Sequence, residues 1–302
     1  MKETVAGSIL MKVPRTRTIT TLAYLVMLGA VLGGCGDDSQ VTFAPPSGKG
    51  VGDDGPQHVH GLGVNPSDDA LMIATHSGLF RAAAGSDVAE RVTDQRQDTM
   101  GFTVVGPDRF LGSGHPDLRE NLPSLLGLIR SQDAGQNWEP VSLLGRADFH
   151  VLRAAGARIY GVNATDGRLY VSADGGRTWA KRTPPAPLFD LATAPGRAEQ
   201  VMASSEDGLF VSRDAGLRWR PMNSEAAGLL AWSRDDALYL VDGTGQVFLS
   251  ADGGGSWRER GGVGGRPAAF VHDGPDLYVA LHTNEVKVST DGGRSWRTRV
   301  RP

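Results

Sequence analysis

Cysteine is almost absent from this chain, since its 302 residues include a single one, Cys35. A lone thiol has no partner within the chain, so no intramolecular disulfide can hold the fold together. Long apolar runs are also lacking: residues 22–32 form a run of 11, whereas a helix that spans a membrane needs about 20. Stability must therefore come from an ordinary apolar core, for which 302 residues with 40% hydrophobic side chains are sufficient.

An excess of positive charge is lacking as well. The chain has 31 Lys and Arg residues against 34 Asp and Glu residues, which gives a formal net charge of −3. Domains that bind nucleic acids usually present a concentrated basic face. We therefore expect no nucleic-acid partner.

The N-terminus has the layout of an export signal. Basic residues within 12–17 precede the apolar run 22–32, and small residues then lead to Cys35. A run of this length suits the core of a signal peptide. The sequence LGGC that ends at Cys35 resembles a bacterial lipobox, which implies cleavage before this cysteine and attachment of a diacylglyceryl group to its thiol. We predict a lipoprotein signal peptide over 1–34 and an extracytoplasmic protein that is anchored to the membrane through Cys35.

The segment that follows is rich in Gly, Asp and Pro, a composition typical of a flexible tether. We therefore predict that the lipidated cysteine and a tether occupy residues 35–57. Met11 is an alternative to Met1 as the true start, because residues 1–10 add nothing to the signal.

An eight-residue pattern occurs five times. SADGGRTW at 172–179 has counterparts that begin at 131, 212, 250 and 289, each with Ser first, Asp two residues later, Gly four later and Trp seven later. Within 150–183, four short β-favouring runs are separated by Gly- and Asp-bearing turns, and helical periodicity is missing. Four antiparallel strands in about 40 residues describe one blade of a β-propeller.

The fold class predicted is therefore all-β, a six-bladed β-propeller with Asp-box hairpins over residues 58–302. The first blade has lost its box, because Ala82, Ala84 and Ser86 replace the Ser, Asp and Gly. The predicted blades are 58–97, 98–142, 148–183, 187–223, 226–261 and 267–302.

The recurring residues are interpreted as structural. The Asp carboxylate can accept hydrogen bonds from turn amides, the Gly allows a left-handed backbone, and the Trp can pack in a seam between strands or blades. A calcium site is not expected, since each box has one acid and Ca²⁺ takes about 6–8 oxygen ligands. The predicted structural residues are Asp133, Asp174, Asp214, Asp252, Asp291, Trp138, Trp179, Trp219, Trp257 and Trp296.

The S-x-D-x-G-x-x-W pattern resembles the Asp-box, or BNR, repeat of sialidases, sortilin-type receptors and photosystem II assembly propellers, strongly over 131–302 and weakly over 58–130. The resemblance implies the propeller fold and says little about activity. Over HVHGLGVNP, ATHSGLF and GSGHP, the chain is also similar to bacterial lipoproteins often labelled glycosyl hydrolases from their repeats.

The sialidase resemblance does not extend to that family's catalytic machinery. Sialidases need an arginine triad, a Tyr–Glu nucleophile pair and an Asp acid/base, and no triad can be argued here. Their Arg-Ile-Pro signature is replaced by GLFRAAA. We expect a binding or scaffold module with a protein or glycan partner. The alternative is a glycoside hydrolase, sialidase-like, that acts on cell-surface glycans.

Most of the histidines fall on one predicted face of the ring. His60 and His150 each lie 22 residues before the first box position of their blade, and the same place holds Met100 in blade two and Asp190 in blade four. His272 falls on the opposite face. Imidazoles at strand ends can simply bond loop carbonyls, but they can also bind a metal ion or a polar ligand such as a glycan.

For a metal site, Zn²⁺ or copper suits imidazole and thioether ligands. The candidate metal ligands are His60, His76, His115, His150 and Met100. The candidate residues for a polar ligand are His282, Asp166, Asp190 and Glu206.

Lipidation can be tested by substituting Cys35→Ser. The natively expressed protein is expected in the membrane fraction and in the detergent phase, because a diacylglyceryl group provides two acyl chains for anchoring. The variant lacks the thiol and is expected in the aqueous phase. Equal membrane retention of both proteins would show that Cys35 is not the anchor.

Overall fold

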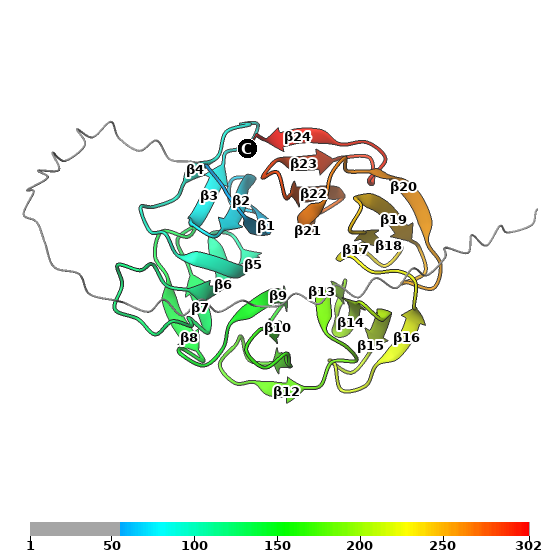
Figure 1. Cartoon of the computed structure of the whole chain (residues 1–302), viewed down its shortest axis with the longest axis horizontal. Helices are drawn as coiled ribbons and strands as arrows, with labels where there is room; N and C mark the ends of the chain where they lie inside the picture. Colours follow the sequence, from blue (N-terminus) through cyan, green and yellow to red (C-terminus); the bar gives the residue numbers. More distant parts are fainter. Residues whose placement is uncertain (1–54, 302) are drawn as a thin grey trace, which may run out of the picture. The chain divides into compact units, whose positions relative to one another are not determined.

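The computed structural model describes residues 55–301, so the predicted signal peptide, Cys35 and most of the predicted tether lie outside the described residues. Figure 1 shows six four-stranded antiparallel sheets arranged in a ring around a central channel. The prediction of an all-β, six-bladed propeller is confirmed. No helix in the described part of the chain is long and apolar enough to cross a membrane.

Each blade consists of four strands that follow one another in sequence from the channel outward. Blade one contains β1 (Val59–Asn65), β2 (Ala70–Thr75), β3 (Gly78–Ala82) and β4 (Glu90–Arg91). Blade two contains β5 (Asp98–Gly106), β6 (Arg109–His115), β7 (Leu128–Ser131) and β8 (Glu139–Ser142). Blade three contains β9 (Phe149–Ala155), β10 (Arg158–Asn163), β11 (Leu169–Ser172) and β12 (Ala180–Arg182).

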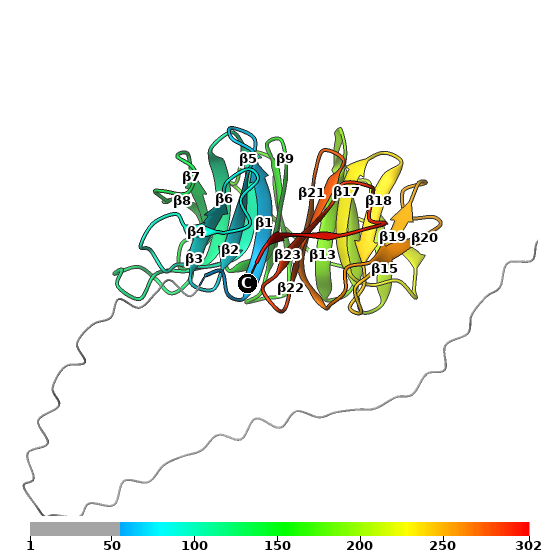
Figure 2. The same ribbon diagram turned by 90° about the horizontal axis from the view of Figure 1, so that it is seen from above.

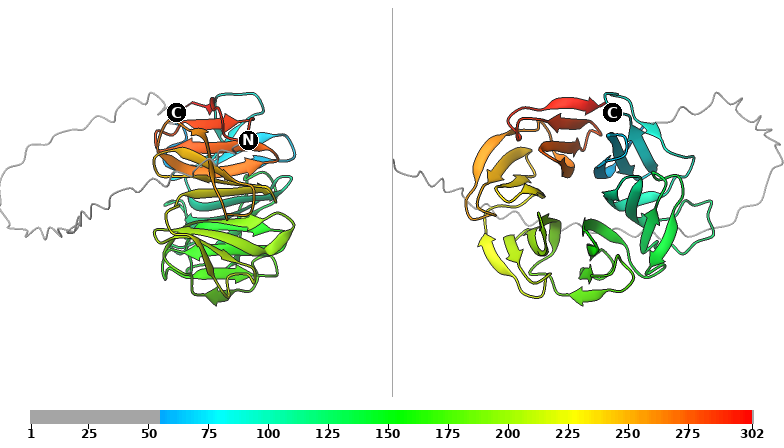
Figure 3. Two further views of the ribbon diagram at one scale, coloured as in Figure 1. Left: turned by 90° about the vertical axis from the view of Figure 1, so that its right-hand side faces the viewer. Right: turned by 180° about the vertical axis from the view of Figure 1, so that it is seen from behind.

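The second half of the ring repeats this plan. Blade four contains β13 (Leu188–Ala194), β14 (Arg197–Ser205), β15 (Gly208–Ser212) and β16 (Arg220–Asn223). Blade five contains β17 (Leu229–Arg234), β18 (Ala237–Val241), β19 (Gln246–Ser250) and β20 (Arg258–Gly262). Blade six contains β21 (Pro267–Asp273), β22 (Asp276–Leu281), β23 (Val286–Ser289) and β24 (Arg297–Val300). The side views show the strands running between the two faces of the ring (Figures 2 and 3).

The core lies in the seams between neighbouring blades. The second strand of a blade is covered on both faces, so β2 is buried at all six positions and reads as a continuous apolar run, ALMIAT. Continuous apolar strands of this kind are expected where a sheet is packed on both sides. The outermost strands are more exposed, as in β16, where Arg220 and Pro221 face solvent.

The ring is closed by side-chain packing between blades six and one. Phe80 of β3 and Val300 of β24 are both fully buried in one apolar cluster that spans this seam. The Arg301 side chain adds an ion pair with Asp87, at 2.8 Å, in the loop before β4. Blade six keeps all four of its own strands, so no strand is exchanged across the closing seam.

The turns of the S-x-D-x-G-x-x-W repeats, which are the predicted Asp-boxes, are held by a repeated set of hydrogen bonds. In blade three, the Ser172 hydroxyl donates to Asp174 Oδ1 at 2.8 Å and accepts from the Gly176 amide at 2.8 Å. Asp174 also accepts the Thr178 amide and hydroxyl, at 2.9 and 2.7 Å, and these bonds lower the pKa of its carboxyl to about 2. Gly176 has a positive φ of 86°, and a Cβ there would lie 2.1 Å from Leu128 of blade two.

The box tryptophan connects this turn to the seam. The Trp179 ring packs on Phe149 with a centroid distance of 5.0 Å and on Tyr170 at 6.3 Å. Its indole N–H donates to the Ser142 hydroxyl of blade two at 2.9 Å, and that hydroxyl donates to the Gly176 carbonyl at 2.6 Å. The turn of blade three and the last strand of blade two are therefore fixed to each other.

These contacts predict that Trp179→Ala lowers the free energy of unfolding by about 3 kcal/mol, because a half-buried aromatic ring is lost from the seam. Trp179→Phe keeps most of the ring packing and removes the indole hydrogen bond, so we expect a smaller loss of about 1 kcal/mol. Chemical denaturation of both variants measures the difference. A Trp179→Ala protein as stable as the wild type would exclude a structural role in the seam.

Candidate functional site

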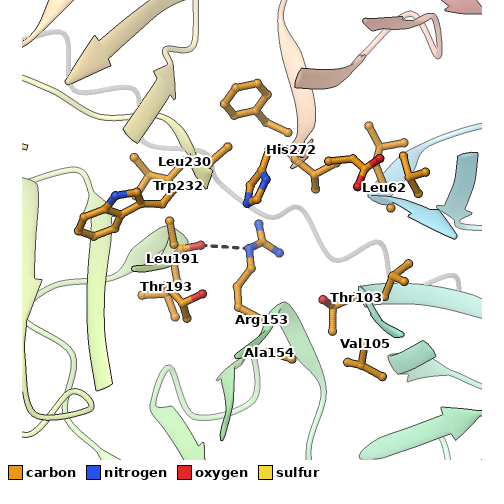
Figure 4. Close-up of a pocket in the computed structure, with 18 of the residues that line it drawn as sticks. Leu62, Thr103, Val105, Arg153, Ala154, Leu191, Thr193, Leu230, Trp232 and His272 are labelled. Carbon is orange, nitrogen blue, oxygen red and sulfur yellow. Dashed lines mark hydrogen bonds between the residues drawn. The ribbon is translucent and has the colours of Figure 1, made fainter. Parts of the chain in front are cut away.

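The channel has two mouths with different chemistry. The mouth formed where the innermost strands begin, together with the loops after the second strands, is called the strand-start mouth. The mouth where the innermost strands end is called the strand-end mouth. It contains a cavity of about 460 Å³ that is lined by Thr103, Arg153, Trp232 and His272, among others (Figure 4).

A β-bulge near the start of five innermost strands shapes the strand-start mouth. In β1, Val59 pairs with Thr75 and Gly61 pairs with Ala74, which leaves His60 as the extra residue. The extra residues in the other four strands are Met100 in β5, His150 in β9, Phe189 in β13 and Ala268 in β21. A bulge redirects its extra residue out of the regular ladder, so each of these five blades places one variable side chain at this rim.

The register agrees with the sequence-based alignment of His60, Met100 and His150. The alignment of Asp190 with them is wrong by one residue, because Phe189 is the bulge residue of blade four. Phe189 is 49% exposed, whereas Asp190 is 1% exposed. A shift of one position along β13 therefore leads from an exposed residue at the rim to a buried one.

Two of the predicted metal ligands, His60 and His76, meet a carboxylate that sequence reasoning missed, Asp98. The nitrogen and oxygen atoms of these three groups all lie within 4.8 Å of one another. His60 Nε2 is 3.3 Å from His76 Nδ1 and 3.7 Å from Asp98 Oδ1, and His76 Nδ1 is 3.2 Å from the same oxygen. Asp98 Oδ1 is buried and accepts no hydrogen bond from any described residue.

Burial sets the protonation of this group. It lowers the pKa of His60 to about 4, with further lowering by the nearby His76, His150 and His58, so His60 is uncharged at neutral pH. Burial also raises the pKa of Asp98, and the carboxylate of Asp148 adds to that effect while the histidines oppose it. The lone pairs of a neutral imidazole are available to a metal ion.

The other two predicted histidines, His115 and His150, face a second carboxylate, Asp148. His150 Nε2 is 2.8 Å from Asp148 Oδ2, and His115 Nε2 is 3.6 Å from the same oxygen. The hydrogen bond to Asp148 raises the pKa of His150. The Asp148 side chain is 7% exposed, and its Oδ1 has no hydrogen-bond partner among residues 55–301.

The remaining predicted residues have other surroundings. Asp190 forms an ion pair with Arg153 at 2.6 Å and accepts two backbone amides. Asp166 accepts hydrogen bonds from the side chains of its own blade, including the Tyr170 hydroxyl at 3.0 Å. His282 and Glu206 are exposed residues that directly follow second strands. Met100 lies in the bulge of β5, two residues after Asp98.

His272 lies at the strand-end mouth, as its position in the sequence predicts. Figure 4 shows its ring directed toward the Arg153 guanidinium near the middle of the channel. Arg153 is held there by a hydrogen bond of 3.0 Å from its Nε to the Leu191 carbonyl (Figure 4) and by its ion pair with Asp190. His272 is therefore separate from the histidines of the strand-start mouth.

No family model matches the chain. Over 103 residues it is 33% identical to the dispase autolysis-inducing protein of Streptomyces mobaraensis, a match that covers 33% of this chain and 27% of that protein. The chain thus spans about a quarter of the curated relative it matches.

Solved structures are similar to a larger part of the chain. A GH74 xyloglucanase from Xanthomonas campestris superposes with a TM-score of 0.56 and 22% identity over 81% of this chain and 45% of the enzyme. YCF48 from Cyanidioschyzon merolae superposes with a TM-score of 0.51 and 14% identity over 81% of this chain and 85% of that protein. At these identities the likeness establishes that the chain shares the β-propeller fold of the GH74 and YCF48 proteins.

Proposed function

We propose that this chain is an extracytoplasmic binding module, lipid-anchored to the membrane at Cys35, which binds a divalent transition metal ion at the strand-start mouth. The ligands are His60, His76 and Asp98, and the ion is Zn²⁺ or copper. The observation that carries the proposal is the convergence of these three groups, with all ligand atoms within 4.8 Å of one another.

The spacing of the ligand atoms fits such an ion. Metal–ligand bonds of about 2.0–2.1 Å in a tetrahedral site place the ligand atoms about 3.3 Å from one another. The three distances among His60, His76 and Asp98 are 3.2, 3.3 and 3.7 Å. Three protein ligands leave one position of a tetrahedral site open, which is the arrangement by which a metal binds an external group.

Electrostatics favours a cation at the same point. A buried carboxylate oxygen without a hydrogen-bond donor is costly, and a bound cation offsets this cost. Asp98 Oδ1 is such an atom, and the neutral His60 beside it provides a lone pair without adding positive charge.

A binding role also fits the relative from Streptomyces mobaraensis, whose name describes an effect on a second protein, dispase. The open coordination position of the metal would face a protein or glycan partner at the membrane surface. A side-chain or sugar oxygen of that partner could complete the site.

The metal proposal predicts that Zn²⁺ raises the melting temperature of the purified protein. An ion at 100 times its Kd stabilises the folded state by about 2.7 kcal/mol, which corresponds to a shift of roughly 5–10 °C for a domain of this size. EDTA should reverse the shift, which a thermal melt measures.

His60→Ala and His76→Ala should reduce this shift, while His272→Ala, at the strand-end mouth, should leave it unchanged. The control matters because histidine binds Zn²⁺ nonspecifically wherever it is exposed. Absence of a shift in the wild type, or an equal loss in His272→Ala, would rule out this metal site.

The same arrangement predicts no hydrolysis of aryl glycosides or xyloglucan above a heat-inactivated control. A glycosidase needs two carboxyl groups placed on either side of the scissile bond. Asp190 is instead engaged by Arg153, and Asp166 by residues of its own blade. Turnover that disappears in Asp98→Asn would favour a hydrolase over a binding module.

A further inference from the structure

Two seams of the ring place an imidazole and a carboxylate at the same pair of register positions. The imidazole lies one residue beyond the partner of the residue that precedes the bulge, as with His76 after Thr75 and His115 after Gly114. The carboxylate belongs to the residue two before the bulge of the next blade, as with Asp98 and Asp148. The imidazole–carboxylate distances are 3.2 Å in the first seam and 3.6 Å in the second.

We infer that the strand-start mouth has a second metal-ion position, formed by His115, Asp148 and His150, and that it binds a divalent transition metal ion beside the first. This inference rests on the proposed function, since it extends the same chemistry from the seam of blades one and two to the seam of blades two and three.

The second set is grouped around one buried carboxylate and is more open than the first, since among the described residues the ligand atoms converge within 4.8 Å only for His60, His76 and Asp98. Asp148 is buried, and its Oδ1 is without a hydrogen-bond partner in the described part of the chain. His115 donates from Nδ1 to the Ser124 carbonyl at 2.7 Å, which leaves the Nε2 lone pair directed toward Asp148. Metal-binding histidines are commonly fixed in this way by a backbone carbonyl on their other nitrogen.

The third ligand, His150, is provided by the bulge of blade three. Its Nε2 donates a hydrogen bond to Asp148 Oδ2 at 2.8 Å. A metal ion would take the place of the shared proton, with the imidazole and the carboxylate as its ligands. In the first seam the bulge ligand, His60, comes from the earlier blade, so the two sets are related but not identical.

Two other seams show that an imidazole paired with a carboxylate is not the default at these positions. Between blades three and four the two positions are Ala164 and Pro187, neither of which can bind a metal through its side chain. Between blades six and one they are His282 and His58, which lack a carboxylate. Imidazole and carboxylate therefore occur together at these positions in two adjacent seams of the described ring.

The two sets of residues are close enough for the charged groups of one set to affect the protonation of the other. The carboxylate of Asp148 opposes ionisation of Asp98, and the imidazole of His150 opposes protonation of His60. One cation in each set would compensate the carboxylates of both Asp98 and Asp148.

The test is a Co²⁺ titration of the purified protein, with the absorption bands of the bound ion as readout. The wild type should bind two equivalents, and His76→Gln and His115→Gln should each bind one, with different spectra. The double variant should bind none. His272→Gln is the matched control and should bind two equivalents, while thermal melts without metal verify that every variant is folded.

Each result has a definite meaning. One equivalent that disappears in His76→Gln but persists unchanged in His115→Gln leaves the proposed function standing and overturns the second position. If the wild type binds one equivalent and each single variant binds none, a single ion is shared by both sets. That result also overturns the second position. A wild type that binds no Co²⁺ contradicts the proposed function itself. If His115→Gln unfolds, Asp148→Asn replaces it with the same expected loss of one equivalent.

Discussion

Packing between neighbouring blades is the interaction on which this structure depends. A single blade has two large faces and only four short strands, so it cannot bury its second strand alone. Tyr160 of β10 and Leu191 of β13 are both fully buried in one cluster because blades three and four cover each other. In blade three, the box turn also attaches the outer part of the blade to blade two through the hydrogen bond from Trp179 to Ser142. Without disulfides in the described ring, stability is distributed over six such seams.

The candidate sites are formed by residues that meet across the same seams. Neither His76 nor Asp98 can form a site within its own blade, because the two residues belong to adjacent sheets. The seam provides the rigid support that holds a loop residue of one blade against a strand-start residue of the next. A metal ion bound there would also join the blades, so ligand binding and ring stability are linked in this part of the molecule.

Sequence reasoning recovers the fold because the boxes repeat at regular intervals and each marks the same turn. It also recovers the histidine face, since counting back from the box to His60 and His150 gives equivalent places in the blade. The count fails at Asp190 because blade four has one more residue between its bulge and its box, and the pairing of β13 with β14 has a second irregularity between Thr193 and Ala194. One residue is enough to change a strand's face from exposed to buried.

The carboxylates Asp98 and Asp148 had no such signal. They lie two residues before a bulge, and acidic residues outside the boxes are common in this chain, so neither stands out by type or spacing. Their importance depends on which loop of the preceding blade lies opposite them. That relation depends on how the six blades are arranged in space, which a pattern along one chain does not contain.

The closing seam distinguishes this propeller from rings that are locked by an exchanged strand. Because blade six keeps β21–β24 to itself, no shared strand joins blades one and six. They are held by packed side chains such as Phe80 and Val300, by the Arg301–Asp87 ion pair and by a backbone hydrogen bond between the same two residues. The ring is therefore closed at one seam, where the first and last blades of the folded chain meet. Opening it would require no hydrogen-bonded ladder to be broken, and it would uncover one side of blade one, the blade that carries His60 and His76.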